Sequence, residues 1–366
     1  MDPRVEKLAK VLVHYSLKVK KGQIFKIQGE VVTLPLIKAV YKEAVEVGAY
    51  PFVQVRIPDN EETFLKYASD SQMKFISPLV KTEINKIDIL LVIWGNDNTR
   101  YLAGVDSRRQ AMIQRTNRPL MKKLFQRIHD KSLSWCGTMF PSQANAQDAD
   151  MSLSDYEDFV YKAGHVLSGD PVKYWTKIYR EQQRLVKILN RFDRIHLESA
   201  DTDLKLRVKG RKWINCAGTE NFPDGEIFTG PIENTAEGYI RYSYPAVYMG
   251  KEVEDVRLEF KNGKVVSESA GKNQDFLTQM LNIDKSARFI GEFAIGTNYE
   301  IKKFTKNILF DEKIGGTCHL AVGASIPESG GKNQSSLHWD MVCNLKNDSQ
   351  IKADGKVIYR NGKFVI

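Results

Sequence analysis

Residues 23–57, QIFKIQGEVVTLPLIKAVYKEAVEVGAYPFVQVRI, decide the fold of the first half of the chain. Residues 23–28 alternate apolar and polar side chains and end at a glycine, which is typical of a half-buried strand. Residues 34–47 carry apolar side chains at helical spacing and stop before Gly48, which indicates a helix. Residues 50–57 again have the pattern of a strand. This order predicts a βαβ unit with parallel strands.

The segments around this unit continue the alternation. Residues 5–18 have the apolar spacing of an amphipathic helix, and residues 87–94 form an apolar run, broken only by Asp88, that suits a buried parallel strand. Residues 58–60, Pro-Asp-Asn, are typical of a turn and helix cap. We therefore predict an α/β domain in the first half of the chain.

The pattern changes near residue 194. Residues 154–192 are helical in character except at Gly169-Asp170-Pro171, and the part after Pro171 is predicted to connect two domains. Beyond it, short alternating segments are separated by turns such as Asn262-Gly263. Because single cores stop growing at about 250–300 residues, a chain of 366 residues should form two domains. We predict an α/β N-terminal domain over residues 1–192, followed by an α+β, strand-rich C-terminal domain over residues 193–366.

The net charge of +9 comes from 54 Lys and Arg against 45 Asp and Glu. Basic residues alternate with acids, as in Lys251-Glu252-Val253-Glu254, and the chain has no basic run with interleaved aromatics and no zinc-finger spacing. We therefore expect no nucleic-acid partner. The rival hypothesis, nucleic-acid binding driven by the charge, predicts association that weakens with salt.

The sequence also bears on the compartment. No apolar stretch approaches the ~20 residues that a bilayer span needs, and the N-terminus lacks the apolar region of a secretory signal. The four cysteines are scattered without Cys-x-x-Cys spacing, which indicates reduced thiols and argues against a structural zinc knuckle. A cytoplasmic protein without a membrane partner is expected.

The chemical signal lies near the C-terminus. His338 and Asp340 are two residues apart, so on a strand both side chains project from one face and Trp339 from the other. An imidazole beside a carboxylate is half of a divalent-metal site. On a strand over residues 317–323, His319 shares a face with small residues that leave room for an ion and a substrate. Cys318 then lies on the opposite face and is interpreted as core.

Two glutamates stand in unusual positions. Glu226 follows a Pro-Asp-Gly turn, and Glu292 follows Gly291 at the start of what we interpret as a small-residue loop. Carboxylates together with imidazoles suit Zn²⁺, Co²⁺ or Mn²⁺. The structural alternatives stay open, because a lone strand histidine is more often hydrogen-bonded than metal-bound, and a glutamate after such a turn is most often solvated.

Other polar residues have simpler interpretations. The remaining histidines lack a glycine-flanked, acid-paired setting and are interpreted as structural: His14, His129, His165 and His196. Basic residues recur with period two over residues 205–211, opposite Leu204, Leu206 and Val208. We interpret this stripe as the exposed face of an amphipathic strand, with an anion-binding role as the alternative.

Taken together, these segments resemble the thermophilic aminopeptidase family, the aminopeptidase T-like metallopeptidases. The resemblance covers essentially the whole chain and is strongest in residues 203–213, 221–231, 291–292, 309–323 and 330–342. It implies a cytosolic, homodimeric exopeptidase that hydrolyses the N-terminal residue from peptides. It further implies two divalent metal ions per subunit, Zn, Co or Mn, in a C-terminal catalytic domain.

Matched motif by motif, the resemblance implies six metal ligands: Glu226, Glu292, Glu312, His319, His338 and Asp340. Residues 313–316 lengthen the interval between Glu312 and His319 relative to the family pattern. Asp340 is the expected bridging ligand, and Glu226 or Glu292 the expected catalytic proton acceptor for a water activated by two metals.

The chain departs from the family pattern at Ile326, where many members carry a tyrosine that could support the tetrahedral intermediate. Lys332 and Tyr359 are candidate substitutes. The departure motivates an alternative hypothesis, in which the protein is a catalytically impaired, metal-binding homologue that acts as an interaction protein.

Overall fold

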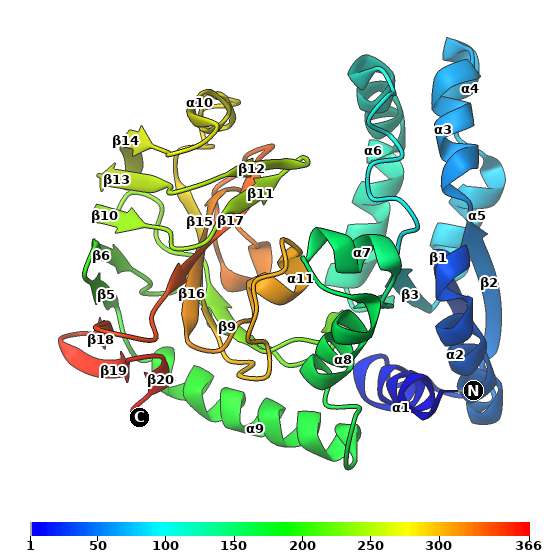
Figure 1. Ribbon diagram of the computed structural model, residues 1–366, viewed down its shortest axis with the longest axis horizontal. Helices are drawn as coiled ribbons and strands as arrows, with labels where there is room; N and C mark the ends of the chain where they lie inside the picture. The colour runs from blue at the N-terminus through cyan, green and yellow to red at the C-terminus, as the bar shows by residue number, and fades with distance from the viewer. Residues whose placement is uncertain (1) are drawn as a thin grey trace. The chain divides into compact units, whose positions relative to one another are not determined.

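The computed structural model describes residues 2–366, and their contacts divide into two units (Figure 1). The first unit runs to Lys173 and also includes Gly218–Phe222. The second unit consists of Tyr174–Ala217 and Pro223–Ile366. We describe each unit separately.

The first unit is built on the predicted βαβ element. Strand β1 (Ile24–Glu30), helix α2 (Leu34–Val47) and strand β2 (Tyr50–Arg56) follow one another, and the two strands pair in parallel. The five-stranded sheet has the order β2-β1-β3-β4-β8, and all its strand pairs are parallel. Its other strands are β3 (Ile89–Trp94), β4 (Ser134–Met139) and β8 (Asn221–Phe222). Helices between parallel strands are the α/β arrangement that the sequence predicts.

The other helices of this unit differ in detail from the predicted ranges. They are α1 (Pro3–Val11), α3 (Pro58–Tyr67), α4 (Asp70–Met73), α5 (Pro78–Lys86), α6 (Ser107–His129), α7 (Gln143–Asp148) and α8 (Leu153–Ala163). The helix predicted over residues 5–18 is α1 followed by a π-helical turn, Leu12–Ser16. Residues 58–60 are the first turn of α3 rather than a separate turn, because proline is well suited to the first helical position.

Helix α9 (Pro171–Leu189) crosses the division between the units. The division lies at residues 173/174, earlier than the predicted 192/193, because Leu185, Val186 and Leu189 of α9 belong to the core of the second unit. The sequence predicts a single division point, but residues 218–222 also belong to the first unit, where β8 pairs with β4.

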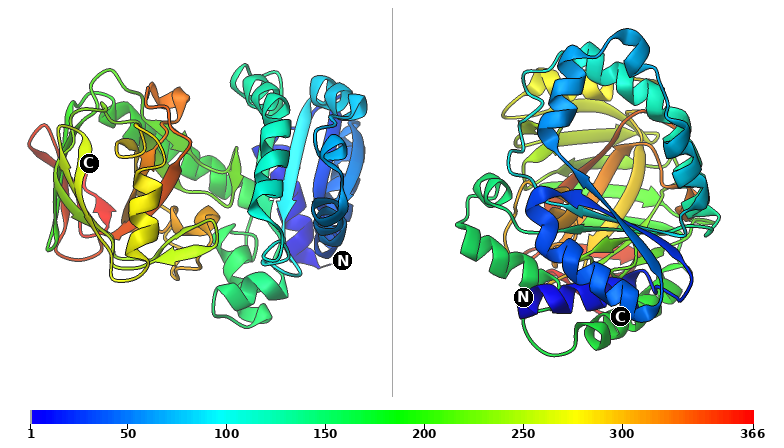
Figure 2. Two further views of the ribbon diagram at one scale, coloured as in Figure 1. Left: turned by 90° about the horizontal axis from the view of Figure 1, so that it is seen from above. Right: turned by 90° about the vertical axis from the view of Figure 1, so that its right-hand side faces the viewer.

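The second unit is strand-rich and contains two antiparallel sheets (Figures 1 and 2). The eight-stranded sheet has the order β14-β13-β10-β6-β5-β18-β19-β20. Its strands are β5 (Arg194–Ser199), β6 (Thr202–Arg207), β10 (Glu237–Arg241), β13 (Arg257–Lys261), β14 (Lys264–Ser269), β18 (Gln350–Ala353), β19 (Lys356–Arg360) and β20 (Lys363–Phe364).

The second sheet of this unit has five strands in the order β17-β16-β15-β9-β7. They are β7 (Ile214–Cys216), β9 (Glu226–Thr229), β15 (Ile290–Gly296), β16 (Thr317–Gly323) and β17 (His338–Asn344). The unit also contains a hairpin of β11 (Ala246–Tyr248) and β12 (Lys251–Val253), and the helices α10 (Gln274–Leu281) and α11 (Ile308–Asp311). Buried apolar residues of both sheets form one continuous core.

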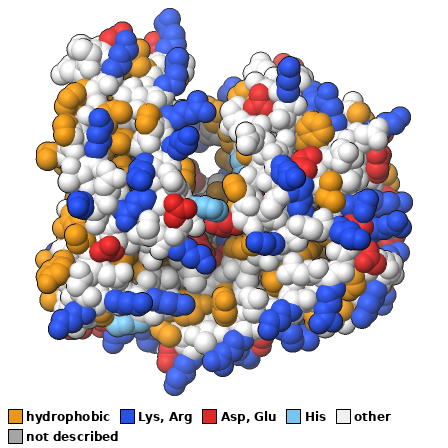
Figure 3. Space-filling view, turned by 180° about the vertical axis from the view of Figure 1, so that it is seen from behind, with side chains coloured by type: hydrophobic (Ala, Val, Ile, Leu, Met, Phe, Trp, Pro, Cys, Tyr) orange, Lys and Arg blue, Asp and Glu red, His pale blue; other side chains and the backbone are white. Residues whose placement is uncertain are grey.

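The surface charge and the apolar character of the helices can be described directly. On the face drawn in Figure 3, Lys and Arg side chains are spread widely, with Asp and Glu among them. Across residues 2–366, no helix combines the length and the apolar character needed to cross a bilayer.

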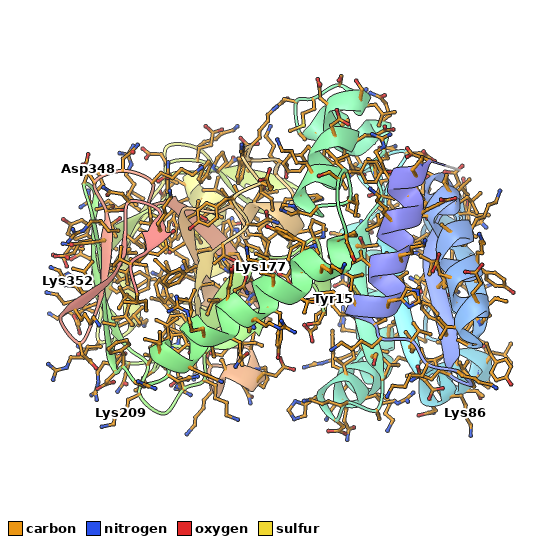
Figure 4. The ribbon with its side chains drawn as sticks, turned by 90° about the horizontal axis from the view of Figure 1, so that it is seen from below. Tyr15, Lys86, Lys177, Lys209, Asp348 and Lys352 are labelled. Atoms are coloured by element: carbon orange, nitrogen blue, oxygen red, sulfur yellow. The ribbon has the colours of Figure 1, made fainter. Side chains whose placement is uncertain are left out.

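The packing of α9 can be tested by a pair of substitutions. Leu189→Ala should lower the free energy of unfolding by about 2–5 kcal/mol, because Leu189 is fully buried in the core of the second unit. Lys177→Ala on the exposed side of the same helix (Figure 4) should change it by less than ~0.5 kcal/mol. Urea denaturation measures both, and equal effects would contradict the packing of α9 into this core.

Candidate metal centre

Five of the six predicted ligands lie on adjacent strands of the five-stranded sheet of the second unit, β17-β16-β15-β9-β7. Glu226 begins β9, Glu292 lies in β15, His319 in β16, and His338 and Asp340 in β17. The strand register places Asp340 opposite Ala321, which is itself opposite Glu292, so neighbouring strands present these carboxylates at the same level of the sheet. Four separate segments thereby converge on one face.

The opposite face of the same strands is apolar. Cys318 and Leu320 of β16, and Trp339 and Met341 of β17, belong to the buried core of the unit. Trp339 packs against Tyr248 and Phe276, with ring centroids 5.4 and 5.9 Å apart. The predicted alternation of faces in residues 317–323 and 338–340 is therefore confirmed.

The interpretation of Glu292 as a loop residue is wrong, because it lies inside β15, where every residue is buried. The small residues that suggest a loop instead allow close packing. A Cβ atom on Gly291 would lie 2.1 Å from the Ala324 carbonyl oxygen, so only glycine fits beside that chain segment. The strand register shifts at this point, between Ile290 and Glu292, as in a β-bulge, a feature that re-aims side chains.

Glu226 and Glu312 reach the cluster from different elements, the start of β9 and the end of α11. Glu226 is 6% exposed, so it is not the solvated hairpin residue of the alternative interpretation. Gly225, which precedes it, has a φ of +123° and packs against Asn298, where a Cβ would lie 2.8 Å from that residue's Cβ. Glu312 follows the last turn of α11 and forms its C-cap. Residues 313–316, which lengthen the interval between Glu312 and His319, form the loop that connects the end of α11 to β16.

All six predicted residues lie in two neighbouring groups: Glu226, Glu312 and His319 in one, and Glu292, His338 and Asp340 in the other. Within each group, one potential ligand atom from each residue lies within 4.8 Å of the others. His319 Nε2 joins the groups, since it is 3.6 Å from Glu226 Oε2 and 3.6 Å from Glu292 Oε1.

Backbone carbonyl groups orient both imidazoles. His319 Nδ1 lies 3.2 Å from the Glu312 carbonyl oxygen, and His338 Nδ1 lies 2.8 Å from that of Ala324. A carbonyl oxygen only accepts, so Nδ1 donates, and in the neutral ring the lone pair of Nε2 faces the carboxylates. Metal-binding histidines commonly have this second hydrogen bond, which fixes the tautomer.

The residues present fit a bound divalent cation. Glu226 Oε2 and Asp340 Oδ1 are buried without a hydrogen-bond partner, and such atoms are costly unless another group compensates them. The ligand set of carboxylates and imidazoles suits Zn²⁺, Co²⁺ or Mn²⁺. In the part of the chain that the structure describes, no comparable group includes any of the other four histidines.

The concentration of carboxylates shifts the ionisation of the whole cluster. Burial raises the pKa of Glu226, Glu292 and Glu312. Burial alone would lower the histidine pKa values, but the surrounding carboxylates outweigh it and raise them to about 9 for His319 and about 10 for His338. The cluster therefore attracts positive charge.

Lys313 is a member of this cluster that the sequence reasoning missed. Its side chain is fully buried, and Nζ contacts Glu312 Oε1, lies 3.2 Å from Glu226 Oε1 and lies 3.9 Å from Asp224 Oδ1. Burial would lower its pKa, but Glu226, Glu312 and Asp224 hold the pKa well above its ordinary value. The available signal was a lysine directly after a predicted ligand and directly before the apolar and small residues 314–316.

The structure separates the two candidate substitutes for the family tyrosine. Tyr359 is fully buried in β19 of the other sheet, within the apolar core, so it is not available to a substrate. Lys332 is exposed, and its backbone N–H donates to Glu233 Oε1 at 2.7 Å.

Arg211, at the end of the basic stripe over residues 205–211, pairs with Glu233 at 2.6 Å. Its side chain is largely buried, whereas the sequence predicts an exposed face there.

Comparison with known proteins agrees with the resemblance. The profile of the family described as thermophilic metalloprotease (M29) matches residues 1–364. Aminopeptidase AmpS of Bacillus subtilis (strain 168) is 27% identical, with all of both chains covered. Aminopeptidase T of Thermus aquaticus is 24% identical over 99% of this chain and 98% of its own.

Two solved structures share the fold over almost the whole chain. Wild-type AmpT from Thermus thermophilus has a TM-score of 0.87 at 23% identity, with 99% of each chain covered. A 2,5-dihydroxypyridine dioxygenase from Pseudomonas putida KT2440 has a TM-score of 0.60 at 12% identity, covering 99% of this chain and 96% of its own. At these identities the likeness shows the fold alone, and the chemistry has to be argued from the site.

Stability of the chelator-treated protein should fall as the pH rises from 7 to 10. The folded protein raises the pKa of His319 and His338 to about 9 and 10, above the ordinary 6.5. The stability they contribute is therefore fully present below about pH 6.5 and is lost as the pH rises through 9 and 10.

Urea denaturation along this pH range measures the effect. His338→Gln should flatten the slope, whereas His129→Gln, at an exposed position at the end of α6, should leave it unchanged. Identical slopes in these two variants would contradict the proposed protonation of the cluster.

Proposed function

The chain belongs to the thermophilic metalloprotease family M29, and we propose that it is a metal-dependent aminopeptidase that removes N-terminal residues from peptides. One observation carries the proposal: six ligand-type side chains from separate segments meet in one buried cluster, where two carboxylate oxygens have no hydrogen-bond partner. The aminopeptidase names of the relatives support the class of reaction. We further propose a cytoplasmic homodimer, in line with the family resemblance.

We assign two divalent ions to the two groups of side chains. Glu226, Glu312 and His319 would hold one ion, and the group of Glu292, His338 and Asp340 would hold the other. When bound, such ions lower the pKa of a water molecule towards ~7 and polarise the carbonyl group of the substrate.

Asp340 is the best candidate for contact with both ions. It directs one carboxylate oxygen towards His319, at 3.9 Å, and the other towards His338, at 3.5 Å. The pKa of Asp340 is about 2, because both histidines and Lys313 outweigh the effect of its burial. Asp340 therefore stays ionised at neutral pH, as a bridging ligand requires.

Glu292 is favoured over Glu226 as the proton acceptor. An ammonium 3.2 Å from Glu226 Oε1 stabilises the ionised form of that carboxylate and makes it a weaker base. In residues 2–366 the ion pairs of Glu292 are with His319 and His338, whose rings are neutral when they bind a metal ion. Because burial also raises the pKa of Glu292, its carboxylate is suited to take a proton from water and pass it to the leaving amine.

Metal content and activity test the proposal together. The purified protein, saturated with a divalent ion, should bind two ions per chain and hydrolyse aminoacyl-p-nitroanilides. A chelator should abolish hydrolysis, and Co²⁺, Zn²⁺ or Mn²⁺ should restore it. Glu292→Gln should lower kcat by about 10²–10⁴-fold, whereas the exposed Glu259→Gln on β13 should leave it unchanged.

Two outcomes would contradict parts of this proposal. Fully metal-loaded protein that cleaves none of a panel of peptides would favour the interaction-protein alternative, for which Ile326 is the motive. Glu292→Gln with full metal content and unchanged kcat would exclude Glu292 as proton acceptor.

A further inference from the structure

The two groups of ligand-type side chains differ in their contact with Lys313. Its ammonium contacts Glu312 and Glu226, the two carboxylates of the first group. For Glu292 and Asp340, the carboxylates of the second group, the ion pairs within residues 2–366 are with His319 and His338. One half of the cluster therefore contains a fixed positive charge that the other half lacks.

Lys313 is held in place and cannot swing out to solvent without local unfolding. Its side chain is 0% exposed. Its backbone N–H donates to the Phe310 carbonyl at 3.0 Å, and its carbonyl accepts from the Asn298 N–H at 3.0 Å. A buried ammonium is tolerated only when carboxylates compensate it, so the lysine and the first group depend on each other.

We propose that Lys313 makes the two halves of the metal centre unequal, by competing with a divalent ion for the carboxylates of Glu226 and Glu312. The group of Glu292, His338 and Asp340 then binds its ion tightly, and the group of Glu226, Glu312 and His319 binds a second ion weakly and exchanges it. This inference rests on the proposed two-ion centre and adds an order of occupation to it.

Asp224 supplies the alternative partner that this exchange requires. It is 1% exposed, and its Oδ1 lies 3.9 Å from Lys313 Nζ, beyond the closer contacts to Glu226 and Glu312. Asp224 is outside both groups of candidate ligands. When a divalent ion takes Glu226 and Glu312, the ammonium keeps a buried counter-ion in Asp224, so its charge is never left unpaired.

Titration calorimetry of the chelator-treated, full-length protein with Mn²⁺ and with Co²⁺ tests the proposal. The wild type should bind two ions in two steps whose dissociation constants differ by at least about tenfold. Lys313→Met removes the charge and keeps the length of the side chain, and should tighten the weaker step by at least about tenfold, because a like charge within a few ångströms is lost. Lys313→Arg keeps the charge and should keep the two steps separate.

Asp224→Asn provides a test of opposite sign that does not require removal of the lysine. Without its alternative partner, Lys313 should hold Glu226 and Glu312 more firmly, and the weaker step should weaken further by several-fold. Circular dichroism of each variant, with and without metal, establishes that the chain is folded.

The outcomes distinguish this inference from the proposed function. Two ions bound with equal affinity by the wild type, or a weaker step that Lys313→Met leaves unchanged or abolishes in a folded protein, would overturn the role of Lys313 and leave the aminopeptidase proposal standing. A wild type that binds no divalent ion would overturn both.

Discussion

The structure of the second unit depends on the burial of several carboxylates in one place. Glu226 and Glu292 are 6% and 3% exposed, and Glu312 and Asp340 lie beside them. Carboxylates this close repel one another and lose their hydration, so the arrangement requires positive charge among them. His319, His338 and Lys313 provide part of that charge from the chain itself, and the remaining deficit suits the cluster to a bound cation.

The sheet gives this cluster a rigid support. Antiparallel pairing fixes the relative positions of β9, β15, β16 and β17, and the same strands bury Cys318, Leu320 and Trp339 on their other face. A shift of one residue in any strand would exchange the polar and the apolar face, so the apolar core specifies the register that brings the candidate ligands together. Core packing and site geometry are therefore one constraint rather than two.

The fold does not by itself fix the chemistry, since proteins with different named activities share it. The chemistry of this chain therefore has to be argued from its side chains: the six ligand-type residues, Ile326 and Lys313. Ile326 stands where the family resemblance implies a tyrosine, and Lys313 places a positive charge inside the proposed centre.

Local patterns in the sequence determined much of the structure. The helix over residues 34–47 has its predicted bounds, because apolar spacing and Gly48 are local signals. Side chains alternate along any strand. This alternation placed His319, His338 and Asp340 on the polar face of their strands, and it placed Cys318 and Trp339 on the apolar face. Glu226 and Glu292 drew attention through their positions after a Pro-Asp-Gly turn and after Gly291. The resemblance to a family assigned both as ligands and added Glu312.

Only the tertiary structure decided the features that depend on distant segments. The small residues beside Glu292 suggested a loop. They are small because residues 323–324 pack closely against them, and the local sequence does not show this contact. The division between the units moved to residues 173/174 because α9 packs against strands that come later in the chain. Lys313 entered the cluster because the loop after α11 folds back towards β9, and a buried ammonium can be recognised only when its carboxylate partners are placed around it.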